Sequence, residues 1–380
     1  MGSKNTNNFI LDLFSEVSDW RLDRCKLHNL SEMLFISLCA MLSGADSFTE
    51  IEEYGYDRYE WLSQYLELEN GIPSHDTFRR VFMELSPASF TKVFQDWMSR
   101  VNQLSKGELI SLDGKQLRGT KDLASGRYGF YLVGAWAHHN GLCLAQSKVG
   151  EKTNEITALP EIIKLLDIEG CILTIDAIGT QRAIAEQIVE QEGDYILSVK
   201  ENQGNLYQEI QAFFTEEAKS GFQFVHLEQD DNWDKGHGRI ERRLCSFSTD
   251  VQILTQAPKW KGIKSMVKIE AERIIGDKKE SNIRYYISSL DTSAEHLNKC
   301  IRSHWSIENS LYWILDMVFN EDRSRIRTAH APENMALLRK WTLNLIKKNK
   351  GKYSVKAARL KAAWNTKILE QLLFGINYNA

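Results

Sequence analysis

Two aspartates in this sequence each follow a short apolar run of the kind found in buried strands. The stretch LISLDGKQLRG carries Asp113, and CILTIDAIGTQ carries Asp176 directly after Ile172–Ile175. Functional groups gather beyond the carboxyl ends of parallel strands in an open α/β sheet, so two such strands would bring both carboxylates to one edge. Two adjacent like charges are unfavourable unless a cation lies between them, and the pair therefore predicts a divalent metal site. For Asp113 alone, a plain Asp-Gly turn is the alternative.

A third carboxylate, Glu308, lies in a long predicted helix that runs from about Thr292 to about Phe319. Apolar residues recur along this helix in a 4-3-4-3-4 spacing that includes Glu308, which predicts that the glutamate lies on the packing face. An unpaired carboxylate on that face would cost roughly several kcal/mol, so Glu308 needs a partner. A metal ion shared with the two aspartates is the more economical partner, and a buried salt bridge to Arg302 or to a nearby lysine is the alternative.

The elements that must position these acids change character along the chain. Residues 9–100 have apolar residues at helical spacing, residues 108–200 alternate strands with amphipathic helices, and residues 220–290 hold alternating stretches that predict an antiparallel insert. Three strands followed by helix, strand, helix and strand is an α/β order in which crossovers join parallel strands. The predicted strands are Glu108–Asp113, Phe130–His138, Leu142–Val149, Cys171–Asp176 and Asp194–Val199. The predicted helices between them are Glu155–Leu166 and Gln181–Glu192.

Composition narrows the class of protein. A chain of 380 residues with 43% hydrophobic and 26% charged residues is an ordinary globular composition and suggests two or three domains. The longest apolar run, Met33–Leu42, is too short to span a bilayer, and no signal peptide is recognisable at the N-terminus. Six scattered cysteines without a C-x-x-C pair make zinc binding and a disulfide framework poor explanations. They fit the reducing cytoplasm, which is the location we expect.

Charge is distributed unevenly along the chain. The formal net charge is -4, but residues 323–380 hold 13 Lys and Arg against 2 Asp and Glu. A basic end on an otherwise acidic protein indicates a polyanionic partner, most often nucleic acid. A solvated helical end rich in lysine is the alternative.

Five motifs, taken together and in this order, resemble the bacterial insertion-sequence transposases of the DDE type. They are SLDGKQLRGT, TIDAIGTQ, YILSVKENQ, HGRIERR and HWSIENSLYWILDMVFNEDRSRIR. The branch that they resemble is that of the H-repeat-associated proteins linked to Rhs elements, and the resemblance covers essentially the whole chain. It implies an α/β fold with an RNase H-like mixed sheet flanked by helices. The implied domains are a helical N-terminal domain (1–105), a catalytic domain (106–350) with a β-rich insertion at about 220–290, and a basic helical tail (351–380).

The resemblance also implies a chemistry. Asp113, Asp176 and Glu308 would form the metal-binding triad, with Mg²⁺ as the ion and Mn²⁺ as the alternative. Three carboxylates can hold two such ions and support cleavage of a phosphodiester and attack by a 3′-hydroxyl. The implied partners are double-stranded DNA, as element ends and as target, and a second copy of the chain in the synaptic complex. Such a protein would be associated with the bacterial nucleoid when bound to DNA.

Several cations are candidate DNA contacts, although each of them alone could be a surface cation or part of an exposed hairpin turn. Many relatives place a Tyr, an Arg and a Lys at set offsets from the catalytic Glu, whereas this chain has Ile301, His304 and Leu315 there. Arg302 is the candidate substitute for the missing arginine. The expected DNA contacts are Lys115, Arg118, Lys200, His237, Arg239, Arg302 and His304.

Two other functions compete with transposition. A nuclease of the same fold would cut DNA without joining an end to a second duplex. A degenerate copy would bind DNA and do no chemistry, but the presence of all three acids argues against it.

Overall fold

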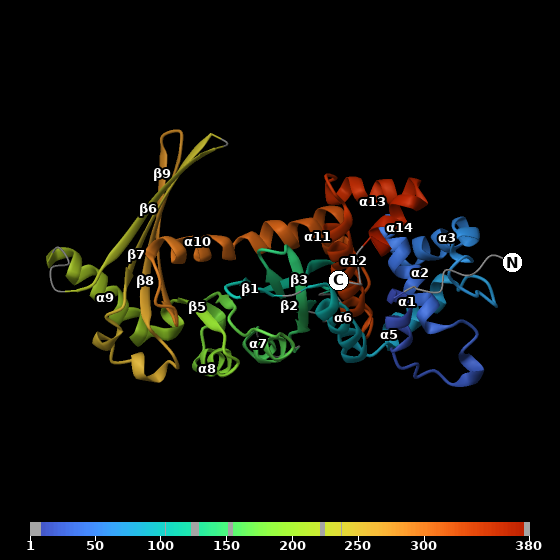
Figure 1. Cartoon of the computed structure of the whole chain (residues 1–380), viewed down its shortest axis with the longest axis horizontal. Helices are drawn as coiled ribbons and strands as arrows, with labels where there is room; N and C mark the ends of the chain where they lie inside the picture. The colour runs from blue at the N-terminus through green and yellow to red at the C-terminus, as the bar shows by residue number, and fades with distance from the viewer. Residues whose placement is uncertain are drawn as a thin grey trace.

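The structure is a computed structural model that describes residues 9–102, 104–122, 129–150, 155–220, 225–236 and 238–375. The chain is elongated, and three regions follow one another along its long axis (Figure 1). A helical region built from both ends of the sequence lies on one side, a mixed sheet with flanking helices lies in the middle, and a β ribbon projects on the other side. We call strands β6 to β9 the insertion ribbon.

The N-terminal part of the chain is helical, as its spacing predicts. Its central helix α2 is buried on every side, which its apolar sequence LSEMLFISLCAML explains. Polar side chains begin the helices: Asn29 accepts a hydrogen bond from the amide of Ser31, and Ser47 forms a capping box with Glu50. The helices are α1 (Phe9–Ser15), α2 (Leu30–Leu42), α3 (Phe48–Asp57), α4 (Tyr59–Leu62), α5 (His75–Glu84) and α6 (Pro87–Val101).

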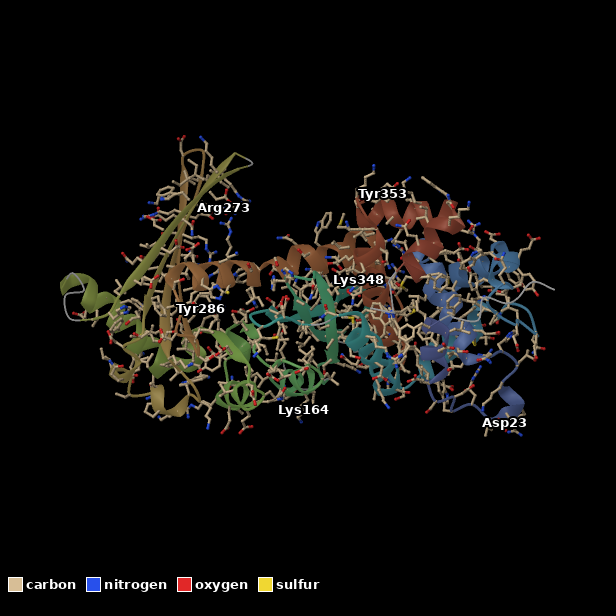
Figure 2. The ribbon with its side chains drawn as sticks, viewed as in Figure 1. Asp23, Lys164, Arg273, Tyr286, Lys348 and Tyr353 are labelled. Carbon is tan, nitrogen blue, oxygen red and sulfur yellow. The ribbon has the colours of Figure 1, made fainter. Side chains whose placement is uncertain are left out.

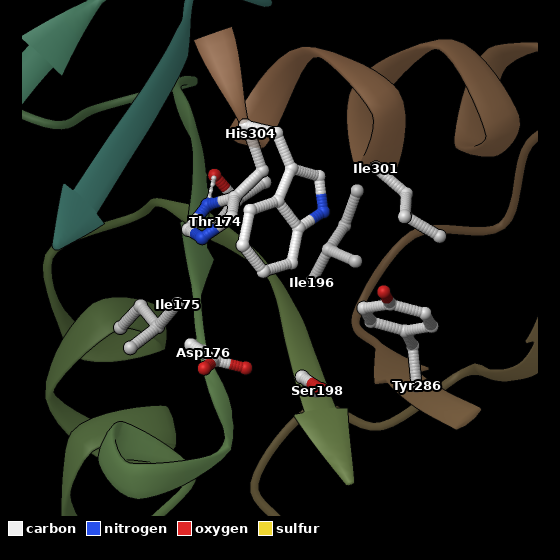
Figure 3. Close-up of a pocket in the computed structure, with 9 residues that line it drawn as sticks. Thr174, Ile175, Asp176, Ile196, Ser198, Tyr286, Ile301 and His304 are labelled. Carbon is white, nitrogen blue, oxygen red and sulfur yellow. Dashed lines mark hydrogen bonds between the residues drawn. The ribbon is translucent and has the colours of Figure 1, made fainter. Parts of the chain in front are cut away.

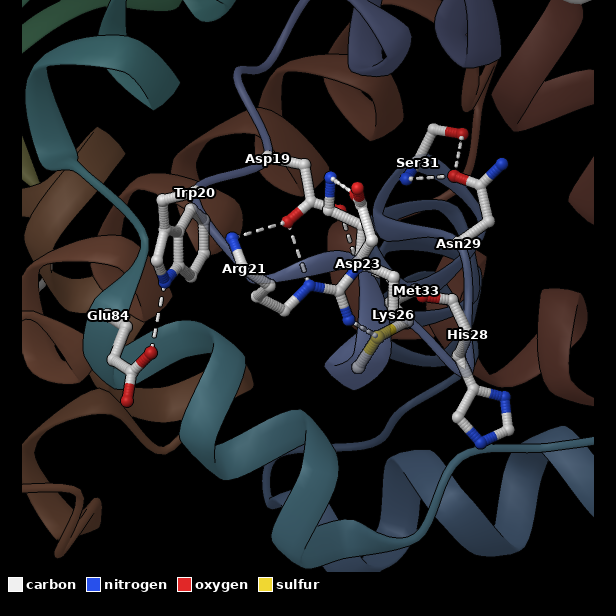
Figure 4. Close-up of polar contacts among 10 residues, drawn as sticks. All are labelled: Asp19, Trp20, Arg21, Asp23, Lys26, His28, Asn29, Ser31, Met33 and Glu84. Carbon is white, nitrogen blue, oxygen red and sulfur yellow. Dashed lines mark hydrogen bonds and ion pairs between the residues drawn. The ribbon is translucent and has the colours of Figure 1, made fainter.

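Polar contacts hold the connection between α1 and α2 in place (Figure 4). The guanidinium of Arg21 binds the carboxylate of Asp19 at 2.7 Å and the carbonyl oxygen of His28 at 2.9 Å. The indole nitrogen of Trp20 donates to the carboxylate of Glu84 at the end of α5, at 3.0 Å. This loop is thus held together by Arg21 and attached to the end of α5 by Trp20.

The middle region is the mixed sheet flanked by helices that the sequence predicts. The five strands of the core run in the order β3-β2-β1-β4-β5, with β2 antiparallel to its neighbours and β4 parallel to both β1 and β5. The RNase H-like α/β expectation is therefore confirmed. The core elements are β1 (Leu109–Leu117), β2 (Phe130–Ala137), β3 (Leu142–Lys148), α7 (Glu155–Lys164), β4 (Ile172–Ile175), α8 (Arg182–Glu190), β5 (Asp194–Val199) and α9 (Gly204–Ser220).

The first strand is longer than expected. It does not stop at Asp113, because β1 continues to Leu117 and stays paired with β2, where Asp113 lies opposite Gly134. The Asp-Gly turn alternative is therefore wrong. The pairing with β2 outweighs the turn preference of the dipeptide, which is a weak local signal.

The insertion ribbon continues the core sheet. Its four strands are antiparallel, and β9 pairs with β5 over the short stretch from Ile196 to Val199, so all nine strands belong to one sheet. Figure 2 shows Tyr286 near the base of the ribbon, where it pairs with Ser198, and Arg273 far from that base. The strands are β6 (Glu228–Gly236), β7 (Arg239–Ser248), β8 (Ser265–Ile275) and β9 (Lys278–Ser288).

The long helix predicted near the third acid crosses from the ribbon to the helical region (Figure 1). It consists of α10 (Ala294–His304), a π-helical turn (Glu308–Tyr312) and α11 (Trp313–Val318). Side chains of β6 bind α10 along its length. Glu228 accepts from the amide of Ala294 at 2.9 Å, and Asp230 accepts from the Asn298 amide group at 2.7 Å.

The C-terminal helices are α12 (Ala331–Asn349), α13 (Val355–Trp364) and α14 (Thr366–Phe374). All three pack against α2, so the end of the chain belongs to the same helical region as its beginning. Three of the cations in the basic stretch 323–380 are buried, namely Arg339, Lys340 and Arg359. Part of the positive charge of this stretch therefore serves the interior and is not available to a polyanionic partner.

Candidate functional site

The register of two strands brings the two predicted aspartates together. The parallel pairing of β1 with β4 ends with Leu112 opposite Ile175. Asp113 and Asp176 are the next residues on the two strands, so their side chains leave the sheet beside each other. The expected meeting of the two strand-end acids is thus seen in the backbone itself.

Asp113 lies in a crowded acidic environment. Burial, followed by the charges of Glu155, Glu308 and Asp176, raises the pKa of Asp113 from 3.8 to about 7, although the amide of Gly114 acts in the opposite direction. Three other carboxylates are thus close enough to repel its negative form. A proton or a cation at this position would relieve the repulsion.

Glu308 lies on a different face of its helix than the sequence predicts. The predicted stripe placed it on the packing face, but in the structure it is exposed, and Ile307 is buried instead. The prediction was wrong because a π-helical turn begins at Glu308 and carries one more residue per turn than the α-helical spacing assumes. The carboxylate therefore needs no buried partner in the helix interface, and it lies close enough to Asp113 for its charge to help raise the pKa of that group.

Glu155 is a fourth acid that the sequence analysis missed. It is the first residue of α7, and its carboxylate lies against Gly114, so close that a Cβ at that glycine would come within 2.1 Å of Oε1. Burial and the charge of Asp176 raise the pKa of Glu155. Glu155 is not preceded by an apolar strand, and the sequence signal that could have found it is the glycine directly after Asp113.

His304 lies at this site without being available to DNA. It is 9% exposed, and Nδ1 is 2.9 Å from Oγ1 of Thr174 (Figure 3). Burial lowers the pKa of His304 to about 4, so the ring is neutral at physiological pH. The expectation that His304 contacts DNA is wrong, because the ring packs beneath Asp176 in the interface between helix and sheet.

Two of the three cations expected near the triad are accessible. Lys200 follows β5 and pairs with Asp176 at 3.4 Å, and Arg118 follows β1 with a side chain 80% exposed. Lys115 is different, since its side chain is 11% exposed and its ammonium binds Asp316 and Glu321. Burial lowers the pKa of Lys115, but the charges of Glu321 and Asp316 outweigh burial and raise it overall. Lys115 is thus occupied within the protein and is not available to a phosphate in this arrangement.

The remaining expected DNA contacts belong to the ribbon and to α10. Arg239 starts β7 and pairs with Glu241 at 2.9 Å. Arg302 of α10 pairs with Asp234 of β6 at 2.7 Å, so it is engaged in the ribbon contact. His237 lies outside the described residues.

Comparison with known proteins decides the family. Residues 104–345 match the family described as Transposase DDE domain, and residues 11–98 match the family described as DDE_Tnp_1-associated. This chain belongs to the DDE transposases. It is a DNA transposase, and thus an enzyme that acts on DNA, as its motifs indicate.

Relatives of this transposase are found in Escherichia coli. The chain is 38% identical to "Putative transposase YncI" of strain O157:H7, over 96% of this chain and 94% of the relative. It is 37% identical to "H repeat-associated putative transposase YhhI" of strain K12, over 96% of this chain and 98% of the relative. Among solved structures, a piggyBac transposase synaptic complex with hairpin DNA matches with a TM-score of 0.46 and 12% identity, over 96% of this chain and 80% of the other.

The family implies dependence on a divalent metal ion, and the donors at this site suit such an ion. Asp113, Asp176, Glu308 and Glu155 offer only carboxylate oxygens, which hard divalent cations prefer. In the described ranges, no three Asp, Glu, His or Cys side chains are close enough to hold an ion as they stand. The donor chemistry of the transposase fits the metal, while the carboxylates would have to draw together around it.

A further question is whether any helix could cross a membrane. Within the part of the chain that the structure covers, none of them combines the length and apolar character that crossing a bilayer requires.

Proposed function

We propose that Asp113, Asp176 and Glu308 hold the catalytic metal of this transposase, with Mg²⁺ as the ion and Mn²⁺ as a substitute. The observation that carries the proposal is the strand register, because both aspartates follow directly after the last β1–β4 pair. The charge of Glu308 helps to raise the pKa of Asp113, which supports the inclusion of Glu308 in the triad. When bound, such an ion activates an oxygen nucleophile and stabilises the leaving oxygen of a phosphodiester.

The chain's own residues then have separable tasks. While no cation is present, Asp113 is mostly protonated below pH 7, since its pKa is about 7, and it gives that proton up when a cation binds. Lys200 neutralises Asp176 across 3.4 Å, and its largely exposed side chain can turn toward a DNA phosphate. Arg118 follows β1, and its side chain is exposed beside its ion-pair partner Asp322. It is a second contact for a DNA phosphate.

The reaction that we propose is cleavage at the ends of the insertion sequence followed by joining of the freed 3′-hydroxyl to target DNA. An insertion sequence has two ends, so one copy of the chain on each end, a homodimer, is the simplest synaptic complex. A bacterial enzyme of this kind meets its substrate at the nucleoid. We also propose the domain division at residues 1–105, 106–350 and 351–380, with the ribbon as the insertion within the second domain.

The test is an assay with a labelled duplex that carries the element end, an unlabelled target duplex and Mg²⁺. Wild type should produce both the cut strand and a joined product, and Asp176→Asn or Glu308→Gln should produce neither while still binding DNA. Cleavage without any joined product would favour the competing nuclease, and normal cutting by either variant would remove that residue from the triad. DNA binding without chemistry in the wild type would favour a degenerate copy.

A further inference from the structure

The three acids share a local sequence pattern that the triad alone does not explain. They end the tripeptides SLD (111–113), TID (174–176) and SIE (306–308), so each acid has a hydroxyl side chain two residues before it and an aliphatic one between. The middle residues are all buried: Leu112 at 1%, Ile175 at 4% and Ile307 at 1% exposure. Their place in the core accounts for the aliphatic position and leaves the hydroxyl position to be explained.

On the two strands, the hydroxyls lie on the same face of the sheet as the acids. Alternate residues of a strand point to the same side, which places Ser111 with Asp113 and Thr174 with Asp176. Ser111 and Thr174 are opposite each other in the β1–β4 register, and their hydroxyl oxygens are 2.9 Å apart. Both residues are buried, at 0% and 3% exposure, directly beside the pair of carboxylates.

Two histidines extend this hydroxyl pair to the helix. Nδ1 of His304 is 2.9 Å from Oγ1 of Thr174, which joins the end of α10 to β4. His138, the residue after β2, lies 2.7 Å from Oγ of Ser111 through Nε2 and 2.9 Å from Oγ of Ser306 through Nδ1. The result is one continuous chain of hydrogen bonds: His304, Thr174, Ser111, His138, Ser306.

The chain is complete with both histidines neutral. Its four bonds need four hydrogens, and three hydroxyls together with one N–H on each neutral imidazole provide enough donors. Burial lowers the pKa of both His138 and His304 to about 4, in agreement with uncharged rings. A continuous hydrogen-bonded chain between a helix and a sheet fixes the relative positions of the elements that it joins.

We propose that this chain, which we call the hydroxyl–imidazole relay, is the positioning device of the active site. The relay links the three hydroxyl residues that stand two positions before the acids. It thereby fixes the position of the turn that carries Glu308 relative to the strands that carry Asp113 and Asp176. His138, His304 and the hydroxyls act through the carboxylates and do not touch the DNA. The inference rests on the proposed function, because it assigns the relay to the metal-binding triad.

The experiment measures Mn²⁺ binding to the full-length protein by electron paramagnetic resonance, without DNA, and strand cleavage as a function of Mn²⁺ concentration. Loss of groups that orient metal ligands typically weakens metal binding by about 10-fold to 100-fold. We therefore expect Ser306→Ala to raise the dissociation constant for Mn²⁺ about 10-fold. The Mn²⁺ concentration that supports half-maximal cleavage should rise by the same factor. Ser306→Thr, which keeps the hydroxyl, should restore wild-type values.

Controls separate positioning from general stability. Ser37→Ala removes a buried hydroxyl that donates to the carbonyl of Met33 within α2, far from the acids, and should leave Mn²⁺ binding unchanged. His138→Gln keeps a donor and an acceptor and should bind Mn²⁺ more tightly than His138→Phe, which keeps only the shape.

Two outcomes overturn the inference, and they are distinguishable. If Asp113→Asn abolishes Mn²⁺ binding while Ser306→Ala and His138→Phe bind as wild type does, the triad holds the metal and the relay does not position it. If Asp113→Asn binds Mn²⁺ as wild type does, the triad assignment fails, and the relay assignment fails with it.

Discussion

The hydroxyl of Tyr312 donates a hydrogen bond of 2.6 Å to the backbone carbonyl of Asp113. The π-helical turn that begins at Glu308 is therefore bound directly to the strand residue that carries the first acid. Tyr312 is buried, and its ring also lies against Gly134, the residue paired with Asp113 on β2. One side chain thus joins helix, β1 and β2 at the site.

We expect Tyr312→Phe to lower the free energy of unfolding by about 1 to 3 kcal/mol, since it leaves the partly buried carbonyl of Asp113 without this donor. Urea unfolding at a single pH measures the loss. Tyr56→Phe, at a side chain 59% exposed, is the matched control and should change stability by less than about 0.5 kcal/mol. Equal effects of the two substitutions would mean that the 2.6 Å contact contributes nothing.

The unusual pKa of Asp113 makes stability depend on pH. Its ordinary pKa is 3.8 and its value in the folded protein is about 7, so the folded protein binds this proton more tightly than the unfolded chain does. The contribution of Asp113 is therefore fully present below pH 3.8 and is lost as the pH rises to about 7. In EDTA above that pH, we expect Asp113→Asn to be more stable than wild type by roughly a few kcal/mol, at about 1.4 kcal/mol per pKa unit.

Urea unfolding of both proteins between pH 4 and pH 8 checks this expectation, and the informative quantity is the difference between them. His138 and His304 have lowered pKa values, so they reduce the stability of both proteins as the pH falls toward 4, and they cancel in the difference. A difference that does not grow with pH would show that Asp113 is not crowded by the other acids. Adding Mn²⁺ should stabilise wild type in proportion to occupancy and leave Asp113→Asn unaffected.

Glu155 offers a separate test of the crowding. Glu155→Gln keeps the shape of the side chain and removes a charge that acts on Asp113. We expect it to raise the melting temperature in EDTA at pH 8 and to weaken stabilisation by Mn²⁺. Gly114→Ala should act similarly, because its methyl group would displace the Glu155 carboxylate, whose Oε1 lies 2.1 Å from that position. Glu161→Gln, on the same helix and exposed, is the control and should change neither quantity.

Lys115 tests the distinction between a DNA contact and an internal ion pair. Its ammonium lies 2.8 Å from the carboxylate of Glu321, which is 1% exposed. Removing one partner of a buried pair leaves the other charge uncompensated, so we expect Lys115→Met to lower the free energy of unfolding by about 3 to 5 kcal/mol. The double variant with Glu321→Gln should recover much of this loss. If Lys115→Met instead preserved stability and weakened DNA binding, the original interpretation as a phosphate contact would stand.

The exposed part of the basic tail is the portion that can bind DNA. Lys352, Lys356 and Lys367 are exposed on or beside α13 and α14, and their side chains can be changed without opening the core. If they contact phosphates, replacing all three with Gln should lower the slope of log K against log salt by about 0.9 per contact. Lys164→Gln on α7, a charge that pairs with Glu161, is the control. An unchanged slope in the folded triple variant would mean that these lysines are solvated.

Truncation at residue 345 would not be informative about DNA. It would remove buried side chains that complete the helical region, among them Leu369, Leu372 and Leu373. Loss of binding after such a truncation would report unfolding and not charge.

The sequence predicted the strands, the order of strands and helices along the chain, and the meeting of the two aspartates. These features follow from short-range patterns of apolar residues and from where the strands end. It missed the position of Glu308, since a π-helical turn leaves no trace in apolar spacing. It also missed Glu155, which reaches the site through the packing of α7 on the sheet. The burial of Lys115 and His304 was not predicted, because residue type alone does not tell whether a cation or a ring is buried.

The contacts between β6 and α10 have a mechanical consequence. Glu228, Asp230 and Asp234 hold α10 at Ala294, Asn298 and Arg302, and the other end of the same helix is held to the core sheet through His304. Because α10 is held at both ends, it acts as a strut that sets the position of the ribbon relative to the turn that carries Glu308.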